Sequence, residues 1–160
     1  LTNRTVNPGQ TISFTATATD ADLPANGLAY SLISPPPGAS IHPVSGAFLW
    51  RPAIAQANTS SVIQVRVQDT GAPALGETKS FTVNVNPLAP VDLRQFSIAN
   101  GEFRFEVGGT TGPDYVIEAS TNLVDWKVLT TIPSAITPFE VVDPTFSTNR
   151  IRFYRAMLQP

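Results

Sequence analysis

Residues 10–19 read QTISFTATAT, and this stretch decides the fold class. Its apolar residues, from Ile12 to Ala18, alternate with serine and threonine. A period of two in β-branched and aromatic residues is typical of a half-buried strand. We therefore expect strands here and in the other segments that repeat the alternation, which are Leu28/Tyr30/Leu32, Ile63/Val65/Val67 and Phe81/Val83/Val85.

Short clusters of turn-forming residues separate these segments. They lie at residues 20–24, 35–38, 45–46 and 69–73 and combine Asp, Ser, Gly and Pro. The chain has 15 Pro and 10 Gly in 160 residues, which leaves little room for long helices because both residues break them. Short strands joined by such turns predict an all-β chain built from antiparallel β-sandwiches.

The stretch NPLAP, residues 86–90, interrupts the alternation. Its two prolines cannot donate ladder hydrogen bonds, so a central strand cannot pass through it. Alternation resumes with Phe103 and Phe105. We therefore predict two tandem sandwiches, at residues 1–87 and 92–160, joined by a proline-containing linker at residues 88–91. The core of the second is expected to draw on its aromatic residues, which are Phe96, Phe103, Phe105, Tyr115, Trp126, Phe139, Phe146, Phe153 and Tyr154.

Composition excludes several classes of function. Ten Lys and Arg against 12 Asp and Glu give a net charge of -2, which does not suit a phosphate-backbone binder, so no nucleic acid partner is expected. No apolar run approaches the roughly 18 residues of a membrane span, so no membrane insertion is expected. The absence of Cys removes disulfides, thiol catalysis and Cys-ligated zinc.

Carboxylates on two of the predicted loops form the one constellation with metal chemistry. Asp20 and Asp22 share a loop, and Asp69 lies between the last two predicted strands of the first sandwich. These loops lie at the same end of a Greek-key sandwich, so the three side chains could converge on Ca²⁺, a cation that takes six to eight oxygen ligands. The alternative is that they are turn residues that hydrogen-bond their own backbone.

Other polar and aromatic residues point to structure rather than catalysis. His42 is the only histidine and is expected at an exposed turn. The alternation of Glu102, Glu106 and Glu118 with apolar residues places these carboxylates on the solvent face of strands. No catalytic residue is predicted, and the chain is not expected to be an enzyme. Trp50 and Trp126 are expected to be buried, the latter at the end of one helical turn over residues 122–126.

The first sandwich contains three local patterns, which are TATATDADLPANGLAYSL (15–32), PPPGASIHPVSGAFLWRP (35–52) and VQDTGAPALGETKSFTVNV (67–85). Together they make it resemble a bacterial cadherin-like domain of the putative-immunoglobulin type. The resemblance implies that Asp20, Asp22 and Asp69 bind Ca²⁺, with Asn26 contributing its backbone carbonyl. In cadherins, acidic residues of the preceding repeat complete the site. The linker NPLAP lacks the cadherin D-x-N-D-N run, which argues against a calcium bridge between the two sandwiches.

Two further patterns, YVIEASTNLVDWKVL (115–129) and RFYRAML (152–158), make the second sandwich resemble a C-terminal module of large exported proteins of Verrucomicrobia-like bacteria. Its order of predicted strands is also similar to that of fibronectin type III. The module resemblance implies that Pro160 lies near a natural C-terminus and that further domains precede the first residue.

We therefore expect a non-catalytic structural or adhesive module of a larger secreted or cell-surface bacterial protein, with Ca²⁺ as its one candidate cofactor. Its expected partners are upstream domains of the same protein and, outside it, a polysaccharide or a surface protein. The alternatives are an accessory carbohydrate-binding unit of a polysaccharide-degrading enzyme and a subunit of an extracellular fibre held by exposed strand edges.

Overall fold

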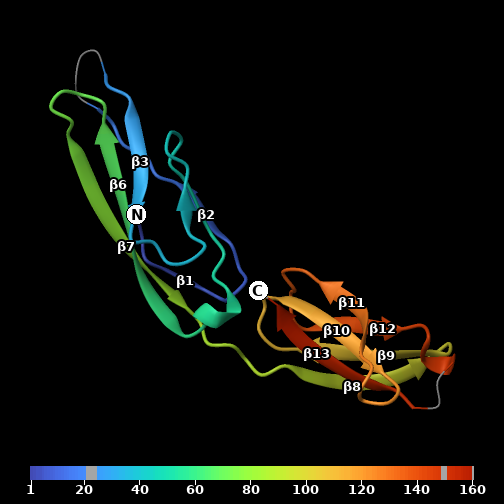
Figure 1. Cartoon of the computed structure of the whole chain (residues 1–160). Helices are drawn as coiled ribbons and strands as arrows, with labels where there is room; N and C mark the ends of the chain where they lie inside the picture. The colour runs from blue at the N-terminus through green and yellow to red at the C-terminus, as the bar shows by residue number, and fades with distance from the viewer. Residues whose placement is uncertain (21–24, 149–150, 160) are drawn as a thin grey trace. The chain divides into compact units, whose positions relative to one another are not determined.

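A computed structural model describes residues 1–20, 25–148 and 151–159, and Asp22 lies outside them. The described elements are β-strands and two three-residue 3-10 helices, which confirms the all-β prediction (Figure 1). The chain divides into two compact units. Unit 1 comprises Leu1–Val6, Thr11–Pro52 and Gln56–Asn86, and unit 2 comprises Asn7–Gln10, Ala53–Ala55 and Pro87–Pro160. No helix in the described part is long and apolar enough to cross a membrane.

Unit 1 is a sandwich of two sheets with an immunoglobulin-like arrangement. Its strands are β1 (Arg4–Val6), β2 (Ile12–Thr15), β3 (Leu28–Ile33), β4 (Ser40–Ile41), β5 (Ala47–Trp50), β6 (Thr59–Asp69) and β7 (Gly76–Val85). One sheet has the order β1-β7-β6-β3 and the other the order β2-β5-β4. All pairs are antiparallel except β1 with β7. The first strand therefore lies on the sheet of the last, whereas constant-type immunoglobulin domains place it on the other sheet.

Alternation along the strands builds the core of unit 1. Phe48 and Trp50 of β5 are buried, while Leu49 between them is 51% exposed. The Phe48 ring stacks on Phe14 at 4.8 Å between centroids and meets Phe81 edge-on at 5.8 Å. Trp50 is fully buried, as predicted, and satisfies its indole N–H by donating to a backbone carbonyl at 3.1 Å.

The first predicted strand is shorter than its alternation suggests. Strand β2 covers Ile12–Thr15. Beyond it, the amide of Ala16 donates a hydrogen bond to the carbonyl of Gly46 in the loop before β5. Its partner β5 is also four residues long, so residues 17–20 have no strand beside them among the described residues. The longer strands β6 and β7 extend past this point (Figure 1).

Unit 2 contains two three-stranded antiparallel sheets. Its strands are β8 (Asp92–Ala99), β9 (Glu102–Gly108), β10 (Asp114–Ser120), β11 (Lys127–Ile132), β12 (Phe139–Asp143) and β13 (Phe153–Gln159). The sheet orders are β12-β9-β8 and β11-β10-β13. The inward residues Phe105, Val107, Tyr115, Ile117 and Val141 form the core between the sheets. The two 3-10 helices, η1 (Ile54–Gln56) and η2 (Phe146–Thr148), follow β5 and β12.

The helical turn predicted at residues 122–126 is wrong. The Asn122 carboxamide oxygen accepts hydrogen bonds from the amides of Val124 and Asp125, at 2.9 and 2.8 Å, and so forms a local turn. Leu123 has a φ of 63°, which a right-handed helix does not allow, and is 56% exposed rather than inward-facing. Trp126 is only half-buried, so the prediction of its burial is also wrong.

Candidate functional site

The carboxylates singled out in unit 1 lie on the loops β2–β3 and β6–β7. Asp20 Oδ2 accepts a hydrogen bond from the amide of Asn26 at 3.3 Å. Asp69, the last residue of β6, accepts hydrogen bonds on Oδ1 from the amides of Gly71 and Leu75, at 2.9 and 3.0 Å. Both aspartates therefore have the backbone contacts expected of turn residues.

The two loops meet at one end of unit 1. The amide of Gly27 donates to Thr70 Oγ1 at 3.2 Å, and the amide of Thr70 donates to the Gly27 carbonyl at 3.0 Å. A Cβ atom placed on Gly71 would lie 3.1 Å from Asp69 Oδ1 and 3.2 Å from Asn26 Nδ2. The structure therefore brings Asn26 next to Asp69, and Asp20 next to Asn26.

The described side chains at this end fit a calcium site only in part. They supply two carboxylates, and one oxygen of Asp69 already accepts two backbone hydrogen bonds. No group of three or more His, Asp or Glu side chains converges anywhere in residues 1–20, 25–148 and 151–159. Ca²⁺ takes six to eight oxygens, so these residues alone are too few to hold it.

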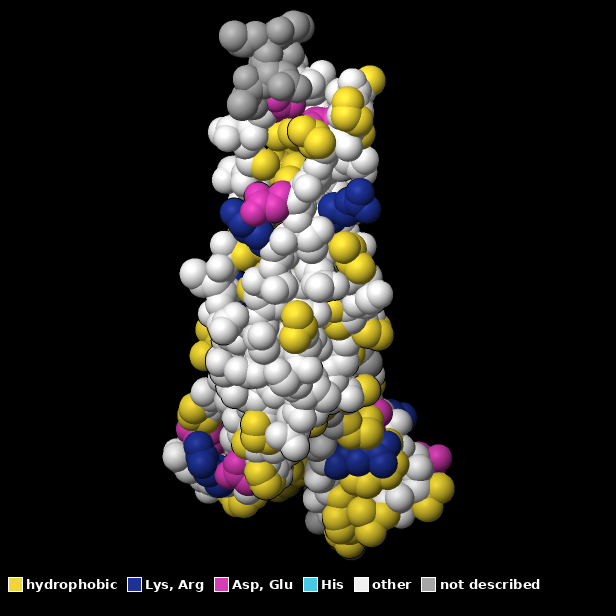
Figure 2. All heavy atoms as spheres, turned by 90° about the vertical axis from the view of Figure 1, so that its left-hand side faces the viewer, with side chains coloured by type: hydrophobic (Ala, Val, Ile, Leu, Met, Phe, Trp, Pro, Cys, Tyr) yellow, Lys and Arg dark blue, Asp and Glu magenta, His cyan; other side chains and the backbone are white. Residues whose placement is uncertain are grey.

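A groove of about 700 Å³ lies beside these loops in unit 1. Strand β2 ends at Thr15 beside this groove, whereas β3, β6 and β7 of the other sheet continue along it. Its lining mixes apolar residues, among them Tyr30, Val65 and Val67, with about as many polar ones, which include Asp20 and Asp69. Figure 2 shows acidic side chains close to apolar ones at the top of the view, above a surface that carries few charges.

Unit 2 holds a buried carboxylate that sequence reasoning missed. Asp143, fully buried at the end of β12, forms an ion pair with Arg152 at 2.6 Å. It also accepts hydrogen bonds from the Tyr154 hydroxyl at 2.9 Å and from the amide and hydroxyl of Thr145 at 2.9 and 2.7 Å. Because β12 and β13 belong to different sheets, this cluster ties the two layers together. Its only sequence signal was an Asp-Pro pair, which is typical of an exposed turn.

The pKa values in this cluster reflect competing effects. Burial alone would raise the pKa of Asp143, but the hydrogen bonds from Thr145 and Tyr154, together with the charge of Arg152, hold it below its ordinary value. Burial and the hydrogen bond to Asp143 raise the pKa of Tyr154. The carboxylate is thus kept ionised and the phenol neutral, which suits a structural ion pair.

The glutamates of unit 2 pair with arginines of the same strand or of an adjacent one. Arg94 Nε donates to Glu106 at 2.6 Å and Arg155 Nε donates to Glu118 at 2.6 Å. Arg104 contacts Glu102 at 2.7 Å on its own strand and Glu140 on β12 at 3.1 Å. The three glutamates of the prediction therefore lie in strands and pair with arginines, and the side chains of Glu106 and Glu118 are only 24% and 13% exposed.

Three further residues considered from the sequence have structural surroundings. His42 is exposed, as predicted, and its Nδ1 accepts hydrogen bonds from two amides of its own turn, at 3.3 and 3.1 Å. The guanidinium of Arg155 lies 4.2 Å from the ring centroid of Trp126. One face of this half-exposed indole is therefore occupied by a cation from its own chain. Tyr154 is half-buried in the aromatic core.

No protein-family model matches the chain, and no curated protein matches it. Among solved structures it is similar to human CDH23 EC21-23 (TM-score 0.43, 15% identity, covering 97% of this chain and 59% of that one). It is also similar to protocadherin gamma B2 extracellular cadherin domains 3-6 (0.41, 16%, covering 69% and 47%). A third such structure is human protocadherin-24 EC1-2 (0.39, 10%, covering 88% and 92%). The chain spans about half the length of the first two, and TM-scores this low assign neither fold nor function.

Proposed function

We propose that the chain is a non-catalytic structural or adhesive module of a larger secreted or cell-surface bacterial protein. The observation that carries this proposal is how the charged side chains of unit 2 are used. Each sheet is braced by ion pairs between neighbouring strands, such as Arg94–Glu106 and Arg155–Glu118. The buried carboxylate of Asp143 in β12 accepts a hydrogen bond from Tyr154 of β13 and so joins the two sheets. Carboxylates used in this way stabilise strand pairing and are not held ready for proton transfer.

The two cores support the same function. Each unit buries its own apolar side chains between two sheets, and the chain contains no Cys and hence no disulfide. Such units are suited to spacing or anchoring other domains. The extracellular location and the bacterial context rest on the sequence patterns of residues 15–85 and 115–158, which resemble modules of exported proteins.

Limited proteolysis combined with substrate screening tests this proposal. We expect folded units that resist cleavage within their strands and are first cut near residues 86–90. We expect no hydrolysis when the chain is incubated with polysaccharide, peptide and ester substrates. Turnover that disappears on replacement of a carboxylate in unit 2, with the fold retained, would contradict a non-catalytic role.

We further propose that the loop end of unit 1 binds Ca²⁺ weakly, through Asp20, Asp22 and Asp69 with the backbone carbonyl of Asn26. Upstream domains of the same protein would supply the missing oxygen ligands. The meeting of Asp20, Asn26 and Asp69 at one end of unit 1 supports this site. Few ligands imply an affinity near the millimolar values of extracellular modules, about 10⁻⁴–10⁻³ M.

Thermal melting of the chain with calcium and with chelator tests the site. Calcium at tenfold its Kd should stabilise unit 1 by about 1.4 kcal/mol and leave unit 2 unchanged. Asp20→Ala should abolish the calcium effect, whereas Asp125→Ala, which changes an aspartate in unit 2, should not. An unchanged melting point across millimolar calcium would remove the isolated site.

Polysaccharide binding is the alternative that one observation favours, because Trp126 keeps part of its indole exposed on unit 2. Stacking on a sugar requires a free aromatic face, and Arg155 covers one face of this ring. Pull-down on insoluble polysaccharides, with Trp126→Ala as the matched variant, distinguishes this role from a purely structural one. Retention that Trp126→Ala abolishes would favour the carbohydrate-binding unit.

A further inference from the structure

Unit 2 leaves one strand edge and one inner sheet face uncovered on the same side. In the sheet β11-β10-β13, strand β13 pairs with β10, and no described strand pairs with its other edge. In the opposite sheet, β12-β9-β8, the strand β8 likewise forms the margin.

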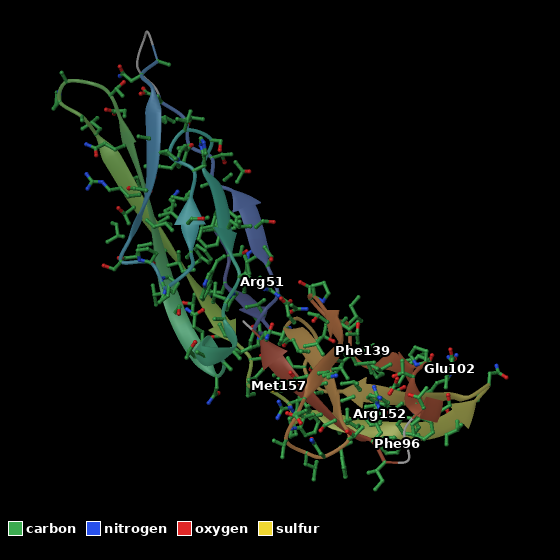
Figure 3. All side chains as sticks on the ribbon, turned by 45° about the vertical axis from the view of Figure 1, so that its right-hand side comes forward. Arg51, Phe96, Glu102, Phe139, Arg152 and Met157 are labelled. Carbon is green, nitrogen blue, oxygen red and sulfur yellow. The ribbon has the colours of Figure 1, made fainter. Side chains whose placement is uncertain are left out.

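The inner face of β8 is apolar and exposed. Phe96 is 59% exposed and Ile98 is 64% exposed, although both face the inner layer. Their orientation follows from β9: Ile98 lies directly opposite Phe103, and the Phe96 ring lies 6.0 Å from that of Phe103 and 6.4 Å from that of the core residue Phe105. Phe96 was expected in the core, and that expectation is wrong because nothing described in the opposite sheet covers it. Figure 3 labels Phe96 on β8 and Met157 on β13.

The two sheets are offset by one strand. Tyr154 of β13 packs on Phe103 and Phe105 of β9, with ring centroids 5.1 Å apart in each case. Tyr115 of β10 meets Phe139 of β12 at 5.4 Å. Because β13 lies over β9, and β10 faces β12, strand β8 extends beyond the edge of β13. One further strand, paired with the free edge of β13, would lie over β8.

We propose that this slot binds one extended segment of a partner polypeptide, which pairs with β13 and inserts apolar side chains onto Phe96 and Ile98. An edge strand presents a row of unpaired N–H and C=O groups, which only another backbone satisfies in full. Strand β13 lacks the usual protection of an edge. It contains no Pro, and its one charged residue, Arg155, is paired with Glu118. The margin strand β8, in contrast, is interrupted by a bulge between Arg94 and Ser97.

A single strand fits this slot better than a second copy of the chain. If β13 paired with β13 of a second copy, the second copy's β13 would lie over β8 of the first copy. The second copy's β9, which lies under its β13, would then have to occupy the space that the first copy's β8 already fills. An edge of seven residues would also bury far less than the roughly 1,200 Å² of a stable interface unless side chains entered the slot. The occupant is therefore a strand that is not already part of a sandwich.

Charge further restricts the occupant. The described charged side chains on the two strands that border the slot are paired within the chain: Arg155 with Glu118, and Arg94 with Asp92 and Glu106. The slot thus offers backbone groups and apolar surface but no unpaired charge among the described residues. The segment it takes should be uncharged where it enters and should carry apolar residues at alternate positions. This surface belongs to unit 2, so the proposal does not depend on calcium binding in unit 1.

Binding of a labelled peptide to the whole chain tests the proposal. The probe is a peptide as long as β13 in which Val alternates with Thr, and the control peptide has Ser in place of each Val. We expect saturable binding of the first peptide and at least tenfold weaker binding of the second. Ile98→Ser should weaken binding about tenfold or more, because burial of an Ile side chain is lost. Ile136→Ser, which changes an Ile that is 78% exposed elsewhere in unit 2, should have no effect.

Hydrogen exchange separates strand pairing from simple adhesion to apolar surface. Amides of residues 153–159 should exchange more slowly in the presence of the Val peptide. If the free peptide aggregates, the same strand appended after residue 160 through a short turn should raise the melting temperature of unit 2 above that of the Ser version. Equal binding of the two peptides, equal loss in Ile98→Ser and Ile136→Ser, or unchanged exchange at β13 would overturn the proposal. A dimer that protects β13 without any peptide would overturn the choice of occupant.

Discussion

Replacing Asp143 should be among the most damaging changes in unit 2. Asp143→Ala leaves the guanidinium of Arg152, whose side chain is only 15% exposed, without its counter-ion. It also removes the acceptor for the Tyr154 hydroxyl and for the amide and hydroxyl of Thr145. Breaking a buried ion pair from one side typically costs about 3–5 kcal/mol. Asp143→Asn should cost less, because its carbonyl oxygen can still accept a hydrogen bond.

Calorimetry of the whole chain measures this effect, with hydrogen exchange at β12 and β13 assigning the transition to unit 2. A second change supplies the control: Arg152→Met in the Asp143→Ala background removes the unpaired charge and should recover part of the lost stability. A loss below about 1 kcal/mol in Asp143→Ala would refute the view that this cluster holds the two sheets together.

The same carboxylate should also contribute to acid unfolding. Its pKa is lower in the folded chain than the ordinary value of about 3.9. A depressed pKa gives stability that is present above the unfolded value and lost as the pH falls through the folded value. The melting temperature of unit 2 should therefore fall with pH below about 4, and fall less steeply in Asp143→Asn.

Three other outcomes follow from the packing. Trp50→Ala, which empties the largest fully buried site of unit 1, should cost about 3–5 kcal/mol and lower only the unit 1 transition in calorimetry. Gly46→Ala should lower the melting temperature of the same transition, because Gly46 has a φ of 69° and a Cβ there would collide with the Ala16 carbonyl oxygen. An unchanged melting temperature would contradict this. Burial raises the pKa of Tyr115 and of Tyr154, so absorbance titration should show both phenols ionising above the ordinary value of about 10. Because these pKa values are raised on folding, the stability they contribute is complete below pH 10 and is lost as the pH rises further.

Much of the fold follows from the sequence, because alternation reports directly on which side of a strand is buried. The patterns at Ile63/Val65 and Phe81/Val83/Val85 gave the inward faces of unit 1 correctly. The structure placed Asp20, Asn26 and Asp69 at one end, where the loop positions suggested they would be. Whether they bind calcium stays a prediction, since Asp22 lies outside the described residues.

Local sequence could not supply the features that depend on an opposing layer. Asp143 precedes a proline and resembles a turn residue, yet it is fully buried. Its partners are Tyr154, which belongs to the other sheet, and Arg152, which lies just before that strand. Phe96 and Phe105 both sit in alternating strands, but Phe105 is 1% exposed and Phe96 is 59% exposed. The difference arises because β13 covers β9 and leaves β8 open. Sequence period fixes the face that a side chain occupies, while the offset of the second sheet decides whether that face is covered.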